Sequence, residues 1–197
     1  MKNYNQIRES IGINLGLSKD EGFNLCQCLL QTSDIIGDVV EIGVFQGGSA
    51  ILMERYKNKN KTLYLFDTFD GWVDVGIEDK GTTLVNGSGW YPTVEEVTKL
   101  FNGKSVEIIN GFFPSSIPEG FSDKKFSLIH SDTDTYNSTL NTLKYFYDKV
   151  SVGGIIIIHD YINLNAPGVK KAVDLFFKDK EEKITSLIDT QVTIIKL

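Results

Sequence analysis

The sequence predicts a single α/β domain, residues 1–197, whose mainly parallel sheet of seven strands carries helices on both faces. Three observations predict this fold class. Apolar segments rich in valine and isoleucine alternate with amphipathic segments, the apolar segments are continuously apolar, and no linker, repeat or low-complexity block divides the chain. Continuously apolar strands are typical of parallel sheets buried on both faces, and a chain of this length can form one full core.

Local signals delimit the expected elements in chain order. Two capping boxes, Ser18 with Glu21 and Thr93 with Glu96, mark helix starts, and Pro167 fits the first turn of the last helix. The expected helices cover residues 18–32 (part of an N-terminal helical segment, 1–33), 47–57, 93–101 and 137–150, with a last one from residue 167. The expected strands cover residues 38–43, 62–67, 105–110, 126–131, 155–159, 184–188 and 192–197.

Two further patterns refine these elements. In the helix expected over residues 137–150, Leu140, Leu143, Tyr147 and Val150 fall on one side at spacings of three and four. Only residues 189–191 separate the last two expected strands, which permits a hairpin and excludes a helical crossover. An antiparallel strand therefore ends the otherwise parallel sheet, which is not usual in dinucleotide-binding Rossmann domains.

Composition narrows the class of protein. The formal net charge is −6 and the pI is near 5.0, which argues against wide contacts with a nucleic-acid backbone. No apolar run approaches the length that spans a bilayer, and residues 1–16 have no signal-peptide core, so we expect no membrane association. Cys26 and Cys28 are too close for an unstrained disulfide and indicate a reducing, cytoplasmic setting, and a metal site at this pair would need ligands that are not nearby.

A glycine-containing turn follows the first expected strand. Its sequence, EIGVFQGG over residues 41–48, lacks the G-x-G-x-x-G spacing that brings backbone against a pyrophosphate. S-adenosylmethionine (SAM) has no phosphate but carries an ammonium and a sulfonium, which a nearby carboxylate suits, and bare glycines leave room for its methionine moiety. Asp67 ends the second expected strand, where an acid can accept hydrogen bonds from both ribose hydroxyls. Each signal alone also fits a tight turn or a capping acid, but together they favour a SAM site.

Acidic residues follow two neighbouring strands of the expected sheet. Asp132 and Asp134 follow the fourth strand, and His159 and Asp160 end the fifth. Parallel neighbours deliver these side chains to one edge of the sheet, where three carboxylates repel one another unless a cation or a proton intervenes. Carboxylate oxygens with one imidazole suit Mg²⁺, Mn²⁺ or similar ions. The alternative is structural: Asp134 caps the next helix and Asp160 orders the following loop. His130, one residue inside the fourth strand, is expected to be a core histidine.

Three ordered motifs resemble those of the macrocin O-methyltransferase (TylF-like) family: EIGVFQGGS (residues 41–49), FDTFDGW (66–72) and DTDTYNST (132–139). The resemblance covers about residues 37–161. It implies the Rossmann-like class I methyltransferase fold, in which an antiparallel last strand is usual, and metal-dependent O-methylation of a sugar or related hydroxyl by SAM.

The resemblance also implies roles for single residues. It implies SAM contacts from Glu41, Gly43 and Asp67, and we expect further cofactor contacts in the same two turns from Phe45, Gly47, Ser49 and Thr68. It implies that Asp132, His159 and Asp160 hold a divalent metal, Mg²⁺ or Mn²⁺, and that Asp134 is the general base. The family usually has aspartate at position 159, and histidine there removes a negative charge and favours Mn²⁺, Fe²⁺ or Zn²⁺. His159 is alternatively a base or a packing residue.

The long glycine-rich segment 71–92 is expected to be a lid over the site. Trp72, Trp90 and Tyr91 can stack on a sugar or ring, although they can also anchor a disordered excursion to the body of the protein. The expected acceptor is a sugar, sugar nucleotide or glycan precursor. The alternatives are a catechol-like diol, a phosphorylated group, or a noncatalytic SAM-binding protein. A homodimer is expected from the fold family alone.

Overall fold

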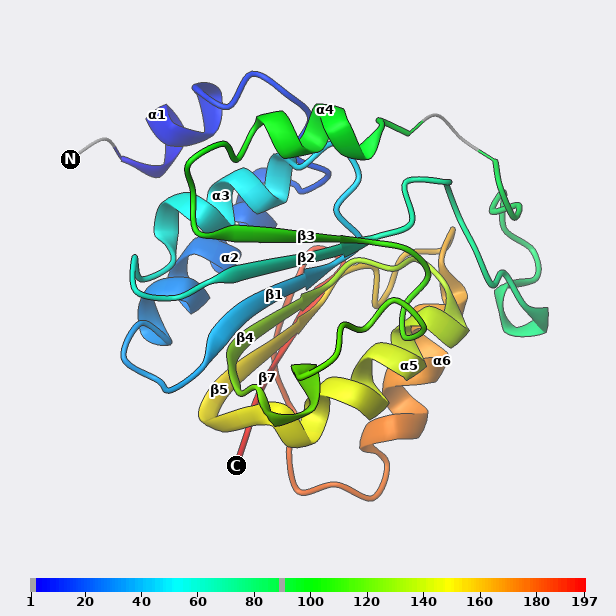
Figure 1. Ribbon diagram of the computed structural model, residues 1–197. Helices are drawn as coiled ribbons and strands as arrows, with labels where there is room; N and C mark the ends of the chain where they lie inside the picture. The colour runs from blue at the N-terminus through cyan, green and yellow to red at the C-terminus, as the bar shows by residue number, and fades with distance from the viewer. Residues whose placement is uncertain (1–2, 89–90) are drawn as a thin grey trace.

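The computed structural model describes residues 3–88 and 91–197 and contains one seven-stranded sheet between two layers of helices (Figure 1). The strand order is β3-β2-β1-β4-β5-β7-β6. The strands are β1 (Asp38–Ile42), β2 (Leu63–Asp67), β3 (Val106–Asn110), β4 (Phe126–Ser131), β5 (Val150–Ile158), β6 (Ile184–Ile188) and β7 (Gln191–Ile195). β1 to β5 pair in parallel, whereas β7 is antiparallel to both β5 and β6. The mainly parallel sheet with an antiparallel last strand is confirmed.

The helices begin where the sequence signals place them. The α-helices are α1 (Tyr4–Glu9), α2 (Lys19–Gln31), α3 (Gly48–Tyr56), α4 (Val94–Lys99), α5 (Tyr136–Phe146) and α6 (Pro167–Phe177), with 3-10 turns η1 (Ile77–Asp79), η2 (Phe121–Asp123) and η3 (Tyr147–Lys149). Both expected capping boxes form, at Ser18 with Glu21 and at Thr93 with Glu96. Helix α1 is an addition that we did not delimit, and Asn3 and Gln6 give it a capping box of its own.

The second half of the chain differs from the expectation in one place. The helix expected to reach residue 150 ends at Phe146, and β5 begins at Val150, well before residue 155. The buried face of α5 is therefore Thr139, Thr142, Leu143 and Phe146. Of the stripe that we expected there, only Leu143 lies on this face. The strand starts early because Val150 pairs with Phe126 before an irregularity, after which Ile155 pairs with Leu128.

The hydrophobic core lies on both faces of the sheet. On the face covered by α2, α3 and α4, Leu25, Leu29, Leu52 and Met53 pack against strand residues such as Leu65. On the face covered by α5 and α6, Phe66, Phe126, Phe146 and Val173 form an aromatic-rich second cluster. Neighbouring residues of β2 thus serve opposite clusters, as the two-residue period of a strand requires.

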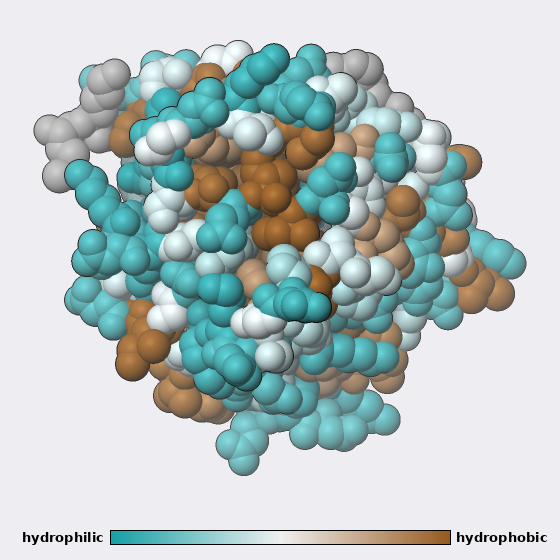
Figure 2. Space-filling model, in the orientation of Figure 1, coloured by the Kyte–Doolittle hydropathy of each residue, from teal (hydrophilic) through white to brown (hydrophobic). Residues whose placement is uncertain are grey.

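The space-filling view shows apolar side chains gathered near the centre of the face drawn, below α4 and over β3 (Figure 2). β3 is an edge strand of the sheet, and its Val106, Ile108 and Ile109 are only half-buried. Within residues 3–88 and 91–197, every helix is too short or too polar to span a bilayer.

The topology brings four strand ends together beside one another. β2, β1, β4 and β5 are consecutive parallel neighbours, so their carboxyl ends share one edge of the sheet. Backbone hydrogen bonds extend the ladder past the last strand residues: Asp132 N donates to Ile42 O at 2.8 Å, and His159 N donates to Ser131 O at 2.9 Å. The residues that follow these strands are thus held in a fixed register.

Candidate active site

A cavity of about 510 Å³ lies at the carboxyl ends of β1, β2, β4 and β5. This is the edge where open α/β sheets bind ligands, and the volume is in the range of small-molecule sites. Its lining comes from the turn after β1, the segment after β2, the turns after β4 and β5, and residues 14–16 before α2. The cavity therefore joins the expected SAM turn to the expected acidic edge.

The turn after β1 depends on Gly43. Its φ is +86°, and a Cβ added there would lie 1.9 Å from the carbonyl oxygen of Asp132. Gly43 N also donates to Phe66 O at 2.9 Å. The missing side chain thus allows the backbone of Asp132 to approach, in addition to leaving space in the cavity.

Asp67 accepts three backbone hydrogen bonds, two from this turn and one from the segment after β2. Its Oδ2 accepts from Val44 N at 2.6 Å and from Phe45 N at 2.8 Å, and its Oδ1 accepts from Phe69 N at 2.8 Å. Each carboxylate oxygen has two lone pairs, so Oδ1 retains accepting capacity toward the cavity that Asp67 lines. The same side chain can therefore shape the turn and accept a ligand hydroxyl.

Glu41 and His130 form a buried pair beneath the turn. They face each other across β1 and β4, with Glu41 Oε1 2.8 Å from His130 Nδ1, and both side chains are fully buried. Burial raises the pKa of Glu41 more than the hydrogen bonds from His130 and Ser49 lower it. Glu41 does not line the cavity. His130 is the core histidine that the strand position predicts.

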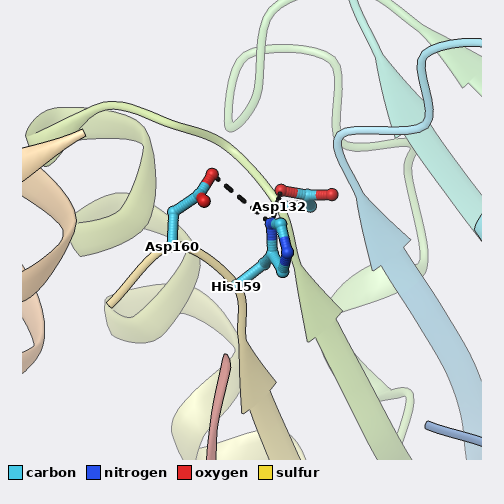
Figure 3. Close-up of side chains that lie close together, drawn as sticks. All are labelled: Asp132, His159 and Asp160. Atoms are coloured by element: carbon cyan, nitrogen blue, oxygen red, sulfur yellow. Dashed lines mark hydrogen bonds and ion pairs between the residues drawn. The ribbon is translucent and has the colours of Figure 1, made fainter. Parts of the chain in front are cut away.

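Asp132, His159 and Asp160 come together at the carboxyl ends of β4 and β5 (Figure 3). His159 Nδ1 lies 2.9 Å from Asp132 Oδ1 and 3.4 Å from Asp160 Oδ2. Its other nitrogen, Nε2, lies 3.2 Å from Oε2 of Glu21 in α2. One candidate ligand atom from each member of the cluster lies within 4.8 Å of the others.

The charges of this cluster shift its ionisation strongly. Burial lowers the pKa of His159, but the neighbouring carboxylates of Asp132, Asp160 and Glu21 raise it further than burial lowers it. Burial raises the pKa of Asp160, yet its hydrogen bonds with His159 and Asp134 hold that pKa below its usual range. Burial, followed by the charge of Asp132 and the hydrogen bond with Asp160, raises the pKa of Asp134 well above its usual range.

Backbone strain is concentrated around the same cavity. Phe45, Phe69, Asp134 and Asp160 all have φ between 48° and 63°, a left-handed region that non-glycine residues rarely adopt. Each such residue costs about 1–3 kcal/mol, and such strain typically persists where the surrounding structure holds a functional geometry. Asp134 and Asp160 thus owe their positions at the cavity to the surrounding packing.

The acidic cluster fits a divalent cation by its donor set. Two carboxylates and one imidazole suit Mn²⁺, Zn²⁺ and similar ions, and Nε2 of His159 already has a carboxylate partner, as is usual for metal-bound histidines. A cation here would also oppose the carboxylate repulsion that raises the pKa of Asp134. The residues present therefore fit a cation held by Asp132, His159 and Asp160.

Comparison with known protein families decides the identity of the chain. The model of the macrocin-O-methyltransferase (TylF) family matches residues 21–195. The chain belongs to this family. As a TylF-family protein it is an O-methyltransferase, and SAM is the methyl donor of the family.

Similar proteins agree with the TylF assignment. The demethyldecarbamoylnovobiocin O-methyltransferase of Streptomyces niveus is 31% identical, with 87% of this chain and 71% of the relative covered. A tetracenomycin 4'-O-methyltransferase of Streptomyces olivaceus is 27% identical. The matched region covers 75% of this chain and 61% of that relative. The structure of the O-methyltransferase NovP superposes with a TM-score of 0.77 at 28% identity, covering 89% of this chain and 78% of NovP.

Most of the site residues expected from the sequence line the cavity of this TylF-family protein. They are Gly43, Phe45, Ser49, Asp67, Thr68, Asp132, Asp134, His159 and Asp160. The two exceptions are Glu41, which is paired with His130, and Gly47, which has a φ of +83° at the N-cap of α3 and faces Val97 and Leu100. Cys26 and Cys28 are buried on α2 as free thiols.

The expected lid contacts the site through Trp72. Its Nε1 donates to Oδ2 of Asp134 at 2.7 Å, and Tyr91 also lines the cavity. Trp90 lies outside the described residues. The segment is anchored by Asp79, which is buried and whose Oδ1 accepts from Tyr136 N at 2.9 Å.

Sequence reasoning missed two contributions to the site. The strap of residues 14–16 lines the cavity, and a Cβ on Gly48 would lie 2.1 Å from Asn14 O, so this glycine admits the strap. Glu21 contacts His159. This contact was not expected, because the capping box of α2 already explains why a glutamate stands at position 21. The one available signal was Gly48, a third glycine in a turn where Gly43 and Gly47 already take positive φ values.

Proposed function

We propose that this protein transfers the methyl group of SAM to a hydroxyl of a sugar, a sugar nucleotide or a sugar-bearing natural-product precursor, assisted by a divalent cation. The observation that carries the proposal is the placing of Asp132, His159 and Asp160 in the same cavity as Asp134 and the glycine turn. The relative from Streptomyces olivaceus, whose name specifies a rhamnosyl-tetracenomycin 4'-O-methyltransferase, supports a sugar hydroxyl as the acceptor.

SAM binding is assigned to the β1 and β2 side of the cavity. Asp67 would accept hydrogen bonds from the ribose, and Ser49, Thr68 and the exposed backbone around Gly43 and Phe45 would contact the rest of the cofactor. Glu41 is separated from the cavity, so its expected contact with SAM becomes indirect: with His130 it supports the turn from below. When bound, SAM supplies an electrophilic methyl group on a sulfonium.

The chemistry at the β4 and β5 side is proton removal from the acceptor hydroxyl. A divalent cation, when bound, supplies Lewis acidity that lowers the pKa of a neighbouring hydroxyl. Asp132, His159 and Asp160 would hold the cation, and Asp134 would accept the proton of the hydroxyl. Trp72, which donates to Oδ2 of Asp134, orients this carboxylate. The indole and Tyr91 of the proposed lid, residues 71–92, would exclude water and stack on the acceptor.

The proposal also covers the cellular setting, the domain organisation and the oligomeric state. The buried free thiols of Cys26 and Cys28 agree with a reducing cytoplasm. We retain a single catalytic domain and a homodimer as proposals, and size-exclusion chromatography with light scattering tests the latter.

Calorimetric titration of the metal-stripped protein tests the proposed function. We expect SAM to bind with a micromolar Kd, and a sugar nucleotide from a panel to bind only after Mn²⁺ or Mg²⁺ is added. Asp132→Ala should abolish cation binding, and with it acceptor binding, while SAM still binds. Absence of SAM binding under every condition would contradict the cofactor assignment, and acceptor binding without metal would contradict the cation site.

A further inference from the structure

Glu21 makes more contacts than its position in a helix cap requires. Its Oε2 accepts from Ser18 N at 3.0 Å, which completes the capping box of α2. Its Oε1 accepts from N and Oγ1 of Thr190, at 3.0 and 2.8 Å, and Oε2 lies 3.2 Å from Nε2 of His159. Only the contact with Ser18 belongs to the cap, so the other three contacts need another explanation.

The second capping box of the chain shows what a cap alone looks like. In α4, Glu96 accepts hydrogen bonds from N and Oγ1 of Thr93 and is exposed to solvent. Glu21 occupies the equivalent position in α2, yet only 4% of its side chain is exposed. Burial of a carboxylate is costly unless it is hydrogen-bonded, and here four donors surround it. The burial of Glu21 is therefore related to its partners across the fold.

The geometry of His159 gives the Glu21 contact a chemical meaning. Nε2 faces Glu21, whereas Nδ1 faces Asp132 at 2.9 Å and Asp160 at 3.4 Å. A carboxylate that accepts from one ring nitrogen fixes the proton on that nitrogen and leaves the lone pair of the other free to ligate. With a cation bound, Glu21 would thus select the form of His159 that keeps its proton on Nε2 and turns the lone pair of Nδ1 toward the cation beside the two aspartates.

We propose that Glu21 is the positioning residue that makes His159 a cation ligand through Nδ1. This inference rests on the cation site of the proposed function and assigns Glu21 a role toward that site. It also explains how a histidine can serve at a position where the resemblance implies an aspartate. An aspartate needs no partner to present a lone pair, whereas an imidazole must have its proton held on the far nitrogen.

A double-mutant cycle on Mn²⁺ binding tests this role. We expect Glu21→Ala to weaken Mn²⁺ binding about 10- to 100-fold, the usual effect of removing such a partner. The matched control is Glu96→Ala, which removes the same residue type from the other capping box and should leave Mn²⁺ affinity unchanged. In a His159→Asp background, Glu21→Ala should no longer weaken Mn²⁺ binding, because no imidazole remains to be oriented.

The cycle separates positioning from a merely structural effect and from failure of the cation site. Equal losses of affinity on removing Glu21 in both backgrounds would overturn the inference, since that pattern means Glu21 only tethers α2 to Thr190. Unchanged affinity in Glu21→Ala would overturn it as well. If the wild-type protein binds no Mn²⁺, the cation site itself is absent and the inference fails with it.

A measurement on the wild-type protein covers the case in which Glu21→Ala does not fold. The chain contains two histidines, so ¹⁵N-detected imidazole spectra of the Zn²⁺-loaded protein should be simple to assign with a His159→Asp reference. We expect His159 to carry its proton on Nε2 and to show a metal-shifted Nδ1. A proton on Nδ1 in the loaded protein would overturn the inference.

Discussion

At the scale of single residues, Asp134 connects the acidic cluster to the lid. It accepts a hydrogen bond from Trp72 and has a strained backbone conformation with φ of 60°. A carboxylate held in this way lines the cavity in a fixed orientation, which suits the base role proposed above.

We therefore expect Asp134→Asn to reduce kcat by about 10²- to 10⁴-fold, because the amide cannot accept the hydroxyl proton. Binding of SAM and Mn²⁺ should change little, since neither is assigned to this side chain. The control is Asp70→Asn, an exposed aspartate in the segment after β2. Steady-state methylation assays with calorimetry make the comparison, and full activity of Asp134→Asn would show that another group takes the proton.

Gly43 supports a second prediction at this scale. Gly43→Ala places a methyl group 1.9 Å from the Asp132 carbonyl oxygen at a positive φ. Gly120→Ala is the matched control, because Gly120 also has a positive φ, +76°, but nothing within 4 Å of the added Cβ. Backbone strain alone should cost about 1 kcal/mol in the control.

The difference in stability between the two variants measures the effect of the contact between the added methyl group and the Asp132 carbonyl oxygen. We expect Gly43→Ala to lose more stability than Gly120→Ala in urea unfolding and to bind Mn²⁺ at least 10-fold more weakly, because Asp132 must move. Equal stability and equal Mn²⁺ affinity in the two variants would show that the turn can relax without disturbing Asp132.

At the scale of elements, the segment after β2 is fastened to the helix that follows β4. Asp79, at the end of η1, accepts from Gly76 N at 2.9 Å through Oδ2 and from Tyr136 N at 2.9 Å through Oδ1. Gly168 in α6 leaves the space that this side chain fills, since a Cβ there would lie 1.8 Å from Oδ1. The lid is thereby attached to both α5 and α6.

Asp79→Ala should therefore loosen the lid. We expect a several-fold higher KM for the acceptor and faster cleavage of residues 71–88 in limited proteolysis, with Mn²⁺ affinity unchanged. Glu78→Ala is the matched control, because the neighbouring Glu78 is an acid that is only partly buried. Equal proteolysis rates in the two variants would mean that Asp79 does not hold the lid.

The elements also show how far local sequence signals reach. Capping boxes and β-branched segments gave helix starts and strands to within about two residues, because both depend on neighbours in the chain. β5 was placed late because Val150 pairs with Phe126, a contact set by the sheet. Side-chain direction was the harder part: Glu41 pairs with His130 and does not line the cavity, and Glu21 reaches His159 across 138 positions. No local pattern reports contacts of that kind.

At the scale of the whole molecule, the end of the chain is fixed by a buried acid. Glu182 accepts from Tyr147 at 2.6 Å, pairs with Lys196 and accepts from Leu197 N at 3.4 Å. Burial raises the pKa of Glu182, but the hydrogen bonds of Lys196 and Tyr147 outweigh it and lower that pKa from 4.5 to about 2. The stabilisation is thus complete above pH 4.5 and is lost as the pH falls toward 2.

Glu182→Gln should remove this stabilisation, which solvent screening limits to about 1–2 kcal/mol at neutral pH. Urea unfolding of wild type and variant at several pH values measures it, and we expect the difference to shrink as the pH falls from 4.5 toward 2. The exposed neighbour in Glu181→Gln serves as the control. A difference that does not change with pH would contradict the assignment to ionised Glu182.

The bond between Glu21 and Thr190 joins positions 169 residues apart, and this has a consequence during synthesis. The ribosome delivers Glu21 early, but Thr190 lies in the turn between β6 and β7, which emerges 169 residues later. Until that hairpin docks, Glu21 lacks the two hydrogen bonds from Thr190. The carboxylate that contacts the ring of His159 is then held less firmly. A nascent chain, or one truncated before residue 190, can thus form the central strands while Glu21, the proposed positioning residue of His159, still lacks its contacts with Thr190.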